Sequence, residues 1–506
     1  MSKNPVFNLK TGADSDIFVS REVTSNGENS GKVLKRDGVY RFPYLTRMTG
    51  NSIKGTTENI ESNELRKGRV NSAPRKGNSS SDGSLDIELS PETFDDQLEA
   101  VFRGKWTPWE SDTNSISNKD GNAYQKGYFA TKCGTSGSRK LIDDGTGNGD
   151  AKGLISCAEG CVVHELNPSD NDVKYSFLKK FGGAAGEDLY QEFAHMAVNS
   201  VSLDVAINEI ITGSFEFMGG NNPEMLSTEA IKTELDGRLI DNTGENFVNN
   251  LPEKASGTLQ YTAREGFLYI NGRQIEYASS LSFSLDNGLE KKYAIFVPNA
   301  ISSTPLALDI TGELTVYLVK DGSDQIFNEA VRDETVEILF CFQNKLEDPD
   351  ALYVFQLFKN KFTDNSVNLN GEDTVDVSLP FSNFDEEACR VFRIIKPRFT
   401  SAEVQDRDAD GELDTVVLLP NIALSEDTDL TQVHLTGKID GVDKTDTLGL
   451  NIATPVLNLD ESSENYMLVT AEFMPVTKTD KEQILEITAE WNGETVVQSF
   501  TIPAMD

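Results

Sequence analysis

The residues best suited to hold a metal lie in a segment rich in Gly, Ser, Asn and Asp. Cys157, Cys161 and His164 follow the spacing Cys-x3-Cys-x2-His, and Cys133 lies upstream. Thiolates and imidazoles bind zinc, but structural zinc sites usually have two closely spaced ligand pairs, and only one loose pair is present here. These residues are weak candidates for a zinc site, and ordinary loop thiols are the preferred interpretation.

A second group of candidate ligands consists of Asp406, Asp408 and Asp410, which precede Gly411 as in the first half of an EF-hand loop. The twelfth position of such a loop should be a bidentate glutamate, but it is Val417. Asp-Gly runs also form turns before strands. A turn is therefore preferred to a calcium site, and no metal or cofactor is expected.

Residues for acid–base or nucleophilic catalysis are scarce. The chain has three histidines, His164, His195 and His434, and His195 is expected to be packed or to face solvent. No serine elbow, HExxH motif or phosphate-binding loop is present. Carboxylate pairs diagnose nothing in a chain with 82 acidic residues. We predict that the protein is not an enzyme.

Length and composition limit the class of protein. A chain of 506 residues suggests about three domains. No stretch approaches the roughly 20 apolar residues of a membrane span, and no signal peptide is visible, so we expect no membrane anchor and assembly in the cytosol. The five cysteines are an odd number and are expected to be reduced thiols.

The charge is strongly acidic and unevenly distributed. The net charge of −36 argues against wrapping nucleic acid, which requires a basic surface. Residues 1–80 contain 14 Lys and Arg against 8 Asp and Glu, whereas residues 396–506 contain 7 against 22. A basic segment can bind acidic neighbouring copies, although a solvated charged loop is an equally good interpretation.

The basic residues are concentrated in residues 46–82, a long segment that ends in a Gly/Ser run. Structureless loops of this length are uncommon in compact domains and are often binding arms. We therefore expect a binding arm, and its basic residues are Arg66, Lys67, Arg69, Arg75 and Lys76.

The clearest structural pattern is a β-hairpin at Asn199–Met218, with a tight turn at Asn208–Glu209. Apolar residues alternate along both strands, so one face is expected to be buried. The buried positions are predicted to be Val201, Leu203, Val205, Ile207, Ile211, Phe215 and Phe217. A similar hairpin begins at Asn365, with apolar positions Val375, Val377, Leu379 and Phe381.

A strand followed by a helix precedes each hairpin. In Gly83–Val101 the strand carries Leu85, Ile87 and Leu89, and Ser90 and Pro91 are expected to begin a helix with Phe94, Leu98 and Val101 on one face. Gly312–Val331 repeats the pattern about 230 residues later. Two such units in the same order predict a duplicated domain.

The spacing between landmarks locates an insert. Val101 and Asn199 are 98 residues apart, whereas Val331 and Asn365 are 34 apart, so the first copy carries a surface insert at about 103–172. Residues 219–255 are polar and are expected to link the copies. Further strands are predicted at Gly266–Tyr277, with a turn at Asn271–Gly272, and at Leu281–Leu285, Tyr293–Val297, Val336–Phe342 and Leu352–Phe358.

A third unit begins at about Lys396. Five apolar or alternating segments predict short strands, and Asn492–Gly493 predicts a hairpin turn. They suggest a small immunoglobulin-like β-sandwich, argued from strand spacing alone. The predicted strands are Thr415–Leu419, Gln432–Ile439, Tyr466–Phe473, Ile484–Trp491 and Thr495–Ile502.

These segments together resemble the tail tube (major tail) proteins of long, non-contractile-tailed bacteriophages. The resemblance rests on SLDIELSPETFDDQLEAVFRGKWTPW at Ser84–Trp109, preceded by the basic arm, and on VNSVSLDVAINEIITGSFEFMGG at Val198–Gly220. ITGELTVYL at Ile310–Leu318 and GEDTVDVSLPF at Gly371–Phe381 resemble the downstream half of the family. The resemblance covers about residues 15–225 and 256–385, and its motifs are packing patterns, not catalytic signatures.

The resemblance implies a mainly β fold: two tandem antiparallel β-sandwich or barrel domains of tail-tube type, each with a flanking helix, followed by the immunoglobulin-like sandwich. The expected domains are 1–225, 226–395 and 396–506. In the family, six tube domains form a ring, and stacked rings form the channel for DNA ejection. Two domains per chain would make each ring a homotrimer with pseudo-sixfold symmetry.

The expected partners follow from the same resemblance. They are other copies of the chain, phage DNA and the tape-measure protein in the lumen, terminator and tail-tip proteins, and host-surface glycans at the third unit. Ser202 and Asp204 are expected to face the lumen. The resemblance also implies a location in the virion, after assembly in the host cytoplasm. A modular adhesin and a hydrolase on a β scaffold are the alternatives.

Overall fold

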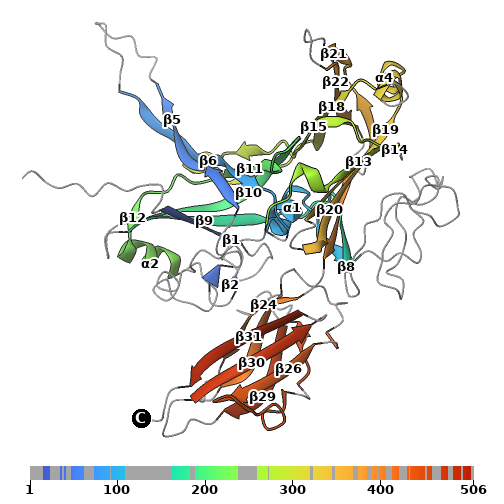
Figure 1. Cartoon of the computed structure of the whole chain (residues 1–506). Coiled ribbons are helices and arrows are strands. Elements are labelled where there is room, and N and C mark those ends of the chain that lie inside the picture. The colour runs from blue at the N-terminus through green and yellow to red at the C-terminus, as the bar shows by residue number, and fades with distance from the viewer. Residues whose placement is uncertain are drawn as a thin grey trace, which may run out of the picture.

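A computed structural model shows an antiparallel β protein with two separate apolar cores (Figure 1). Among the described residues, no helix is long and apolar enough to cross a membrane. The structure describes residues 15–22, 35–36, 39–40, 47–61, 73–91, 93–108, 162–182, 188–236, 259–271, 273–319, 323–344, 348–368, 374–384, 389–395, 398–405, 413–420, 430–431, 433–450, 453–457, 469–476, 483–491 and 494–502.

We refer to residues 15–236 as the first unit, 259–395 as the second and 398–502 as the third. The first unit contains β1 (Ser15–Arg21), β2 (Lys35–Arg36), β3 (Val39–Tyr40), β4 (Met48–Asn51), β5 (Lys54–Ile60), β6 (Arg75–Glu88), α1 (Asp95–Val101), β7 (Thr107–Pro108), β8 (Val162–Leu166), β9 (Lys174–Phe181), β10 (Leu189–Ala206), β11 (Thr212–Gly219), β12 (Leu226–Ser227) and α2 (Thr228–Asp236).

In the described parts of the second and third units, the strands are accompanied by a short 3-10 helix and an α-helix. The second unit contains the 3-10 helix η2 (Ala263–Glu265), β13 (Phe267–Ile270), β14 (Arg273–Gln274), β15 (Ala278–Asp286), β16 (Glu290–Lys292), β17 (Ser302–Thr304), β18 (Asp309–Tyr317), α4 (Ser323–Val331), β19 (Val336–Asn344), β20 (Asp348–Phe362), β21 (Ser366–Asn368), β22 (Asp376–Asn383) and β23 (Cys389–Ile395). The third contains β24 (Phe399–Gln405), β25 (Leu413–Pro420), β26 (His434–Ile439), β27 (Val442–Asp443), β28 (Val456–Leu457), β29 (Val469–Val476), β30 (Gln483–Trp491) and β31 (Glu494–Ile502).

One continuous sheet runs through the first two units. Its strand order is β4 and β5, both paired with β6, then β11, β10, β15, β18, β22 and β21. The pair β10–β15 joins the units, with Ser200 opposite Asp286 and Ala206 opposite Ser280. All neighbours are antiparallel. Because β4 and β5 share one position beside β6, this sheet has eight strand positions.

The same strand pairings occur in both units. β1 pairs with β9 as β13 pairs with β19, and β9 pairs with β10 as β19 pairs with β20. β6 pairs with β11 as β18 pairs with β22, and β4 pairs with β6 as β15 pairs with β18. A helix follows β6 and β18 in each case. The sequence repeat therefore has a counterpart in sheet topology.

The alternating patterns fold as expected because the apolar side chains of all these strands meet in one core. It contains most of the predicted residues of both hairpins and of the strand–helix segment, including Leu85, Leu98, Val201, Phe215 and Leu379, but not Ile207 or Val375. The third unit has its own core between two four-stranded sheets, β24–β25–β29–β28 and β27–β26–β30–β31. Figure 1 shows this sandwich beside the larger sheet assembly.

Several local predictions were wrong. The first helix begins at Asp95, not after Ser90, whose hydroxyl bonds to Thr93 instead. Ile207 is 47% exposed in the hairpin turn, and Tyr293–Val297 is an exposed loop, not a strand. The polar segment after residue 219 contains α2, which buries Ile231 and Leu235.

The basic segment is also more ordered than predicted. β5 and the first half of β6 form a hairpin, with Thr57 opposite Ser79 and Ile60 opposite Arg75. It projects away from the main sheet in Figure 1. Backbone pairing of two twisted strands therefore replaces the structureless loop that the polar composition suggested.

Candidate functional site

The exposed face of the continuous sheet carries hydroxyl and carboxylate side chains. Because side chains alternate along a strand, each residue next to a buried one in the same strand lies on this face, and residues paired across strands share a face. Its acidic residues are Asp86, Glu88, Asp204, Glu216, Asp286, Asp309, Glu313 and Asp376. The other positions facing this way on β6 (84–88), β10 (200–206), β11, β15, β18, β21 and β22 include no lysine or arginine.

Hydroxyl groups hold several of these carboxylates in place. Ser214 donates to Asp86 Oδ1 at 3.0 Å, and Ser200 donates to Glu216 Oε2 at 3.1 Å. Ser378 donates to Glu313 in the second unit. The side chains bond to one another along the sheet, which leaves a fixed, negatively charged surface.

The predicted inner-sheet residues occupy the opposite, buried face. Val201, Leu203, Phe215, Phe217, Val377 and Leu379 are at most 1% exposed, and Val205 and Val375 are partly buried. Ser202 is partly exposed and Asp204 is exposed on the polar face. The alternation read from the sequence therefore separates the two faces correctly for these residues.

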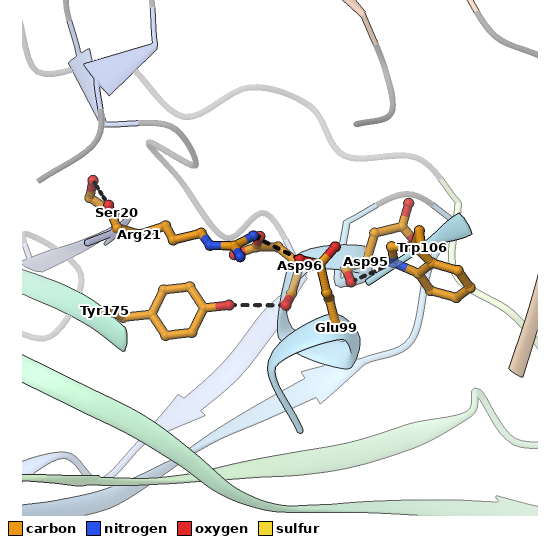
Figure 2. A network of polar contacts seen from close by, with 7 residues as sticks. All are labelled: Ser20, Arg21, Asp95, Asp96, Glu99, Trp106 and Tyr175. Atoms are coloured by element: carbon orange, nitrogen blue, oxygen red, sulfur yellow. Dashed lines mark hydrogen bonds and ion pairs between the residues drawn. The ribbon is translucent and has the colours of Figure 1, made fainter. Parts of the chain in front are cut away.

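A buried charged network surrounds α1, whose seven residues are all buried. Arg21 of β1 donates to Asp96 Oδ1 at 3.2 Å and to Glu99 Oε1 at 2.9 Å (Figure 2). Burial by itself lowers the pKa of Arg21, but Glu99 and Asp96 outweigh it and raise that pKa above its ordinary value. The hydroxyl of Tyr175 donates to the Asp96 carbonyl at 2.9 Å. These bonds fix the helix to the first unit.

Asp95 connects the same helix to the second unit. Arg393 of β23 donates to its Oδ2 at 2.5 Å, and Tyr353 of β20 donates to its Oδ1. Arg393 is 1% exposed and lies over the Trp106 ring at 4.6 Å. Burial, together with Asp95, raises the pKa of Tyr353 well above its ordinary value. The helix is therefore the polar junction between the first two units.

The sequence did not identify this network, although it contained a signal for it. Asp95, Asp96 and Glu99 are interleaved with apolar residues on every side of a short helix. A helix buried on all sides must pair its acids with partners. The partners Arg21 and Arg393 are 372 residues apart, so no local pattern relates them.

The metal candidates remain mostly untested. Cys157, Cys161, Asp406, Asp408 and Asp410 lie outside the described residues. Within the part of the chain that the structure describes, no group of three His, Cys, Asp or Glu residues could hold a metal ion. His164 is buried in β8, where desolvation and the neighbouring Arg393 lower its pKa to about 3. A nearby guanidinium opposes binding of a cation there.

His195 forms a different contact. Its side chain is mostly exposed, but its Nδ1 lies 2.6 Å from Glu22 Oε2, and its backbone N–H donates to Glu22 Oε1 at 2.8 Å. The backbone has a φ of 57°, and the β9–β10 register shifts at this position. Burial alone raises the pKa of Glu22, but the bonds from His195 and Ser176 lower it overall. The pair stabilises a bulge in β10.

The basic arm is described only in part. Arg75 and Lys76 are exposed on β6, opposite Ile60 and Asn59 of β5. Arg66, Lys67 and Arg69 lie outside the described residues. The hairpin thus presents at least two cations beyond an otherwise acidic sheet.

An antiparallel sheet with one buried and one acidic face defines a β-rich protein whose candidate functional surface is a sheet face, not a pocket. The chain belongs to the phage tail tube protein family, because the model of that family matches residues 12–382. The match includes the first two units and ends before the third.

Other comparisons add little. The tail tube of phage SPP1 matches with 11% identity and a TM-score of 0.20, over 26% of this chain and 75% of that one. A FadL homologue from Pseudomonas aeruginosa matches with 9% identity and a TM-score of 0.06, over 76% and 88% of the chains. Both scores are too low for either likeness to bear on the fold. No curated protein matches.

Proposed function

We propose that the protein is the tail tube subunit of a long, non-contractile-tailed bacteriophage, with two tube domains in each chain. The observation that carries the proposal is the repeated strand pairing of the first two units, joined edge to edge by β10 and β15. Each unit contributes four strand positions to one sheet. Three chains then make a ring of six similar domains.

The dimensions suit a channel. Three copies of the eight-position sheet give 24 strands. With strands about 4.8 Å apart and tilted by about 40°, such a cylinder measures about 45–50 Å between opposite backbones. Closing the sheet across three subunits also removes the free edges that would otherwise invite aggregation. The lumen can accommodate a DNA duplex and, before ejection, the tape-measure protein.

The acidic face supports its assignment to the lumen. Its carboxylates repel phosphates, and the absence of Lys and Arg from its strand positions removes the counterion-release term that binds DNA without regard to sequence. DNA can therefore slide past without sticking. Ser202 and Asp204 belong to this surface in the proposal. No catalytic step and no cofactor is assigned to the protein.

The third unit is proposed to be an immunoglobulin-like decoration on the outside of the tube. It has a separate core and lies outside the family match. Host-surface glycans are the proposed ligands for it, while terminator and tail-tip proteins contact the ends of the tube. The mature protein is part of the virion, after assembly in the host cytoplasm.

Electron microscopy of concentrated protein and of virions tests this function. We expect tubes with a central channel, and rings in projection with threefold symmetry and six similar lobes. Strict sixfold symmetry with one chain in each lobe would contradict the trimer, and a chain that forms neither rings nor tubes under any condition, and is absent from virion tails, would contradict the function.

A further inference from the structure

An exposed apolar tip lies between β16 and β17. Ile295 is 82% exposed and Phe296 is fully exposed. The Val297 amide donates to the Ala294 carbonyl at 3.2 Å, so Ile295 and Phe296 are the central residues of a turn. Phe296 has a φ of 69°, which a bulky side chain rarely adopts. Such strained residues are concentrated at contact sites, where the surrounding structure holds them.

The base of this tip is fixed to the continuous sheet. The Ser79 amide donates to the Pro298 carbonyl at 2.7 Å, and the Ala300 amide donates to the Gly220 carbonyl at 3.1 Å. A Cβ at Gly220 would lie 2.4 Å from the Ala300 carbonyl oxygen, so only glycine permits this approach. Lys291 bonds to Ser80 and forms an ion pair with Asp82. The tip is therefore presented at a defined position.

An apolar groove of about 370 Å³ lies at the other end of the same strands. It forms where the β10–β11 turn meets η2, β13 and the start of β15, and the exposed Ile207 lies at its edge. Its apolar lining includes Ile207, Phe267, Leu268, Ile275, Phe340 and Phe342.

The tip and the groove lie at opposite ends of β15. Ser280, beside the groove, pairs with Ala206, whereas Asp286, which leads to the tip, pairs with Ser200. The nine residues of β15 span about 30 Å at about 3.3 Å each, so the tip cannot reach the groove of its own chain. It can reach the groove of a copy stacked head to tail.

We propose that the Ile295–Phe296 tip of one subunit inserts into this groove of a subunit in the next ring. The inference rests on the proposed tube and adds the contact that stacks it. A patch at one end that fits a pocket at the other makes a heterologous contact, which does not close and so extends as a filament. The tip lies in the connection between β15 and β18, and the hairpin of β5 and the first half of β6, here called the basic hairpin, lies in the corresponding connection between β4 and β6. Both therefore project toward the same neighbour.

The first test replaces Ile295 and Phe296 by aspartate. Because burial of a phenylalanine contributes about 1.5–3 kcal/mol and 1.4 kcal/mol is a factor of ten, tubes should require at least about tenfold more protein. Isolated rings and the fold should persist. Val442→Asp is the matched control, since Val442 is also exposed but lies in the third unit.

The second test is a cross-link between rings. Phe296→Cys and Ile207→Cys are combined in a chain carrying Cys133→Ser, Cys157→Ser, Cys161→Ser and Cys341→Ala, because Cys341 lines the groove, while the buried Cys389 is retained. Oxidation of assembled tubes should give a ladder of covalent multimers. A chain with only one of the two added cysteines should give no ladder of more than two chains.

The outcomes separate the stacking contact from the tube itself. Unchanged tubes from the aspartate variant, or tubes of the double-cysteine chain without a ladder, would overturn the stacking contact and leave the proposed function intact. If the unaltered chain and the Val442→Asp control form neither rings nor tubes, the proposed function fails, and the contact fails with it.

Discussion

At the residue scale, the buried ion pair between Asp95 and Arg393 is the most consequential contact. It joins a helix of the first unit to a strand of the second, and both residues are buried. Nε and Nη2 of Arg393 have no hydrogen-bond partner among the described residues. The ion pair with Asp95 and the contact with the Trp106 ring therefore offset the cost of burying the Arg393 charge. Removing one member of such a pair leaves the other charge buried and unpaired.

We therefore expect Arg393→Met to lower the free energy of unfolding of the two-unit core by about 3–5 kcal/mol. Urea denaturation followed by tryptophan fluorescence measures it. Adding Asp95→Asn should restore part of the loss, because the double variant has no unpaired charge. A loss below about 1 kcal/mol in the single variant would mean that water or other groups compensate Asp95.

Glu337 gives a prediction of pH dependence. Burial raises its pKa from 4.5 to about 7, although Gln356 and Arg390 act in the opposite direction. The folded protein therefore holds a proton that the unfolded chain releases. The contribution of Glu337 to stability is complete below about pH 4.5 and is lost as the pH rises through 7.

Glu337→Gln should consequently stabilise the protein at pH 8 by about 1–3 kcal/mol relative to the original chain, with less gain at pH 5. Thermal unfolding across this pH range measures the difference. Glu334→Gln, at an exposed position, should have little effect at either pH. An equal gain at both pH values would assign the effect to packing.

At the element scale, strands with a strict alternation were predictable, and elements fixed by distant contacts were not. The hairpins near Val201 and Val377 could be recognised because a period of two places apolar residues on one buried face. The start of α1 was misplaced because Ser90 and Pro91 form a local cap signal, whereas the helix position is set by Arg21 and Arg393. The Tyr293–Val297 segment has strand composition, but in the structure it is an exposed turn with no strand partner among the described residues.

The basic hairpin, formed by β5 and the first half of β6, allows a test that keeps its strand pairing. Arg75 pairs with Ile60 and Lys76 with Asn59 in the β5–β6 ladder, so removing them would alter the sheet. Replacing residues 62–72 by Asn-Gly, together with Arg75→Glu and Lys76→Glu, should leave the monomer folded and weaken ring stacking. Circular dichroism and sedimentation measure the two properties.

Salt provides the control for this variant. Stacking of the original chain should weaken between low and high ionic strength, because attraction between exposed charges is screened. The variant should show little salt dependence. Normal tubes from the variant at low salt would remove the basic hairpin from the stacking contact.

At the scale of the whole molecule, the division into domains 1–225, 226–395 and 396–506 stays a prediction, and the order of landmarks in the sequence did not predict how closely the first two units are joined. Their apolar side chains form one core, and β10 and β15 make their sheets continuous. Nothing local in Ser200–Ala206 reveals that it pairs on both sides, because its alternation is equally compatible with an edge strand. The surface properties of the assembled molecule were similarly hidden, since the acidic face combines residues from seven strands.

The β10–β15 pair has a consequence for the rate of assembly. In a ring of three chains, three of the six junctions between tube domains are made when each chain folds, at an effective concentration set by the intervening chain and not by the amount of protein in the cell. Only the other three junctions depend on encounters between subunits. A ring built this way needs two encounters where a six-chain ring needs five. Tube growth therefore remains possible at protein concentrations where separate domains would stay dispersed.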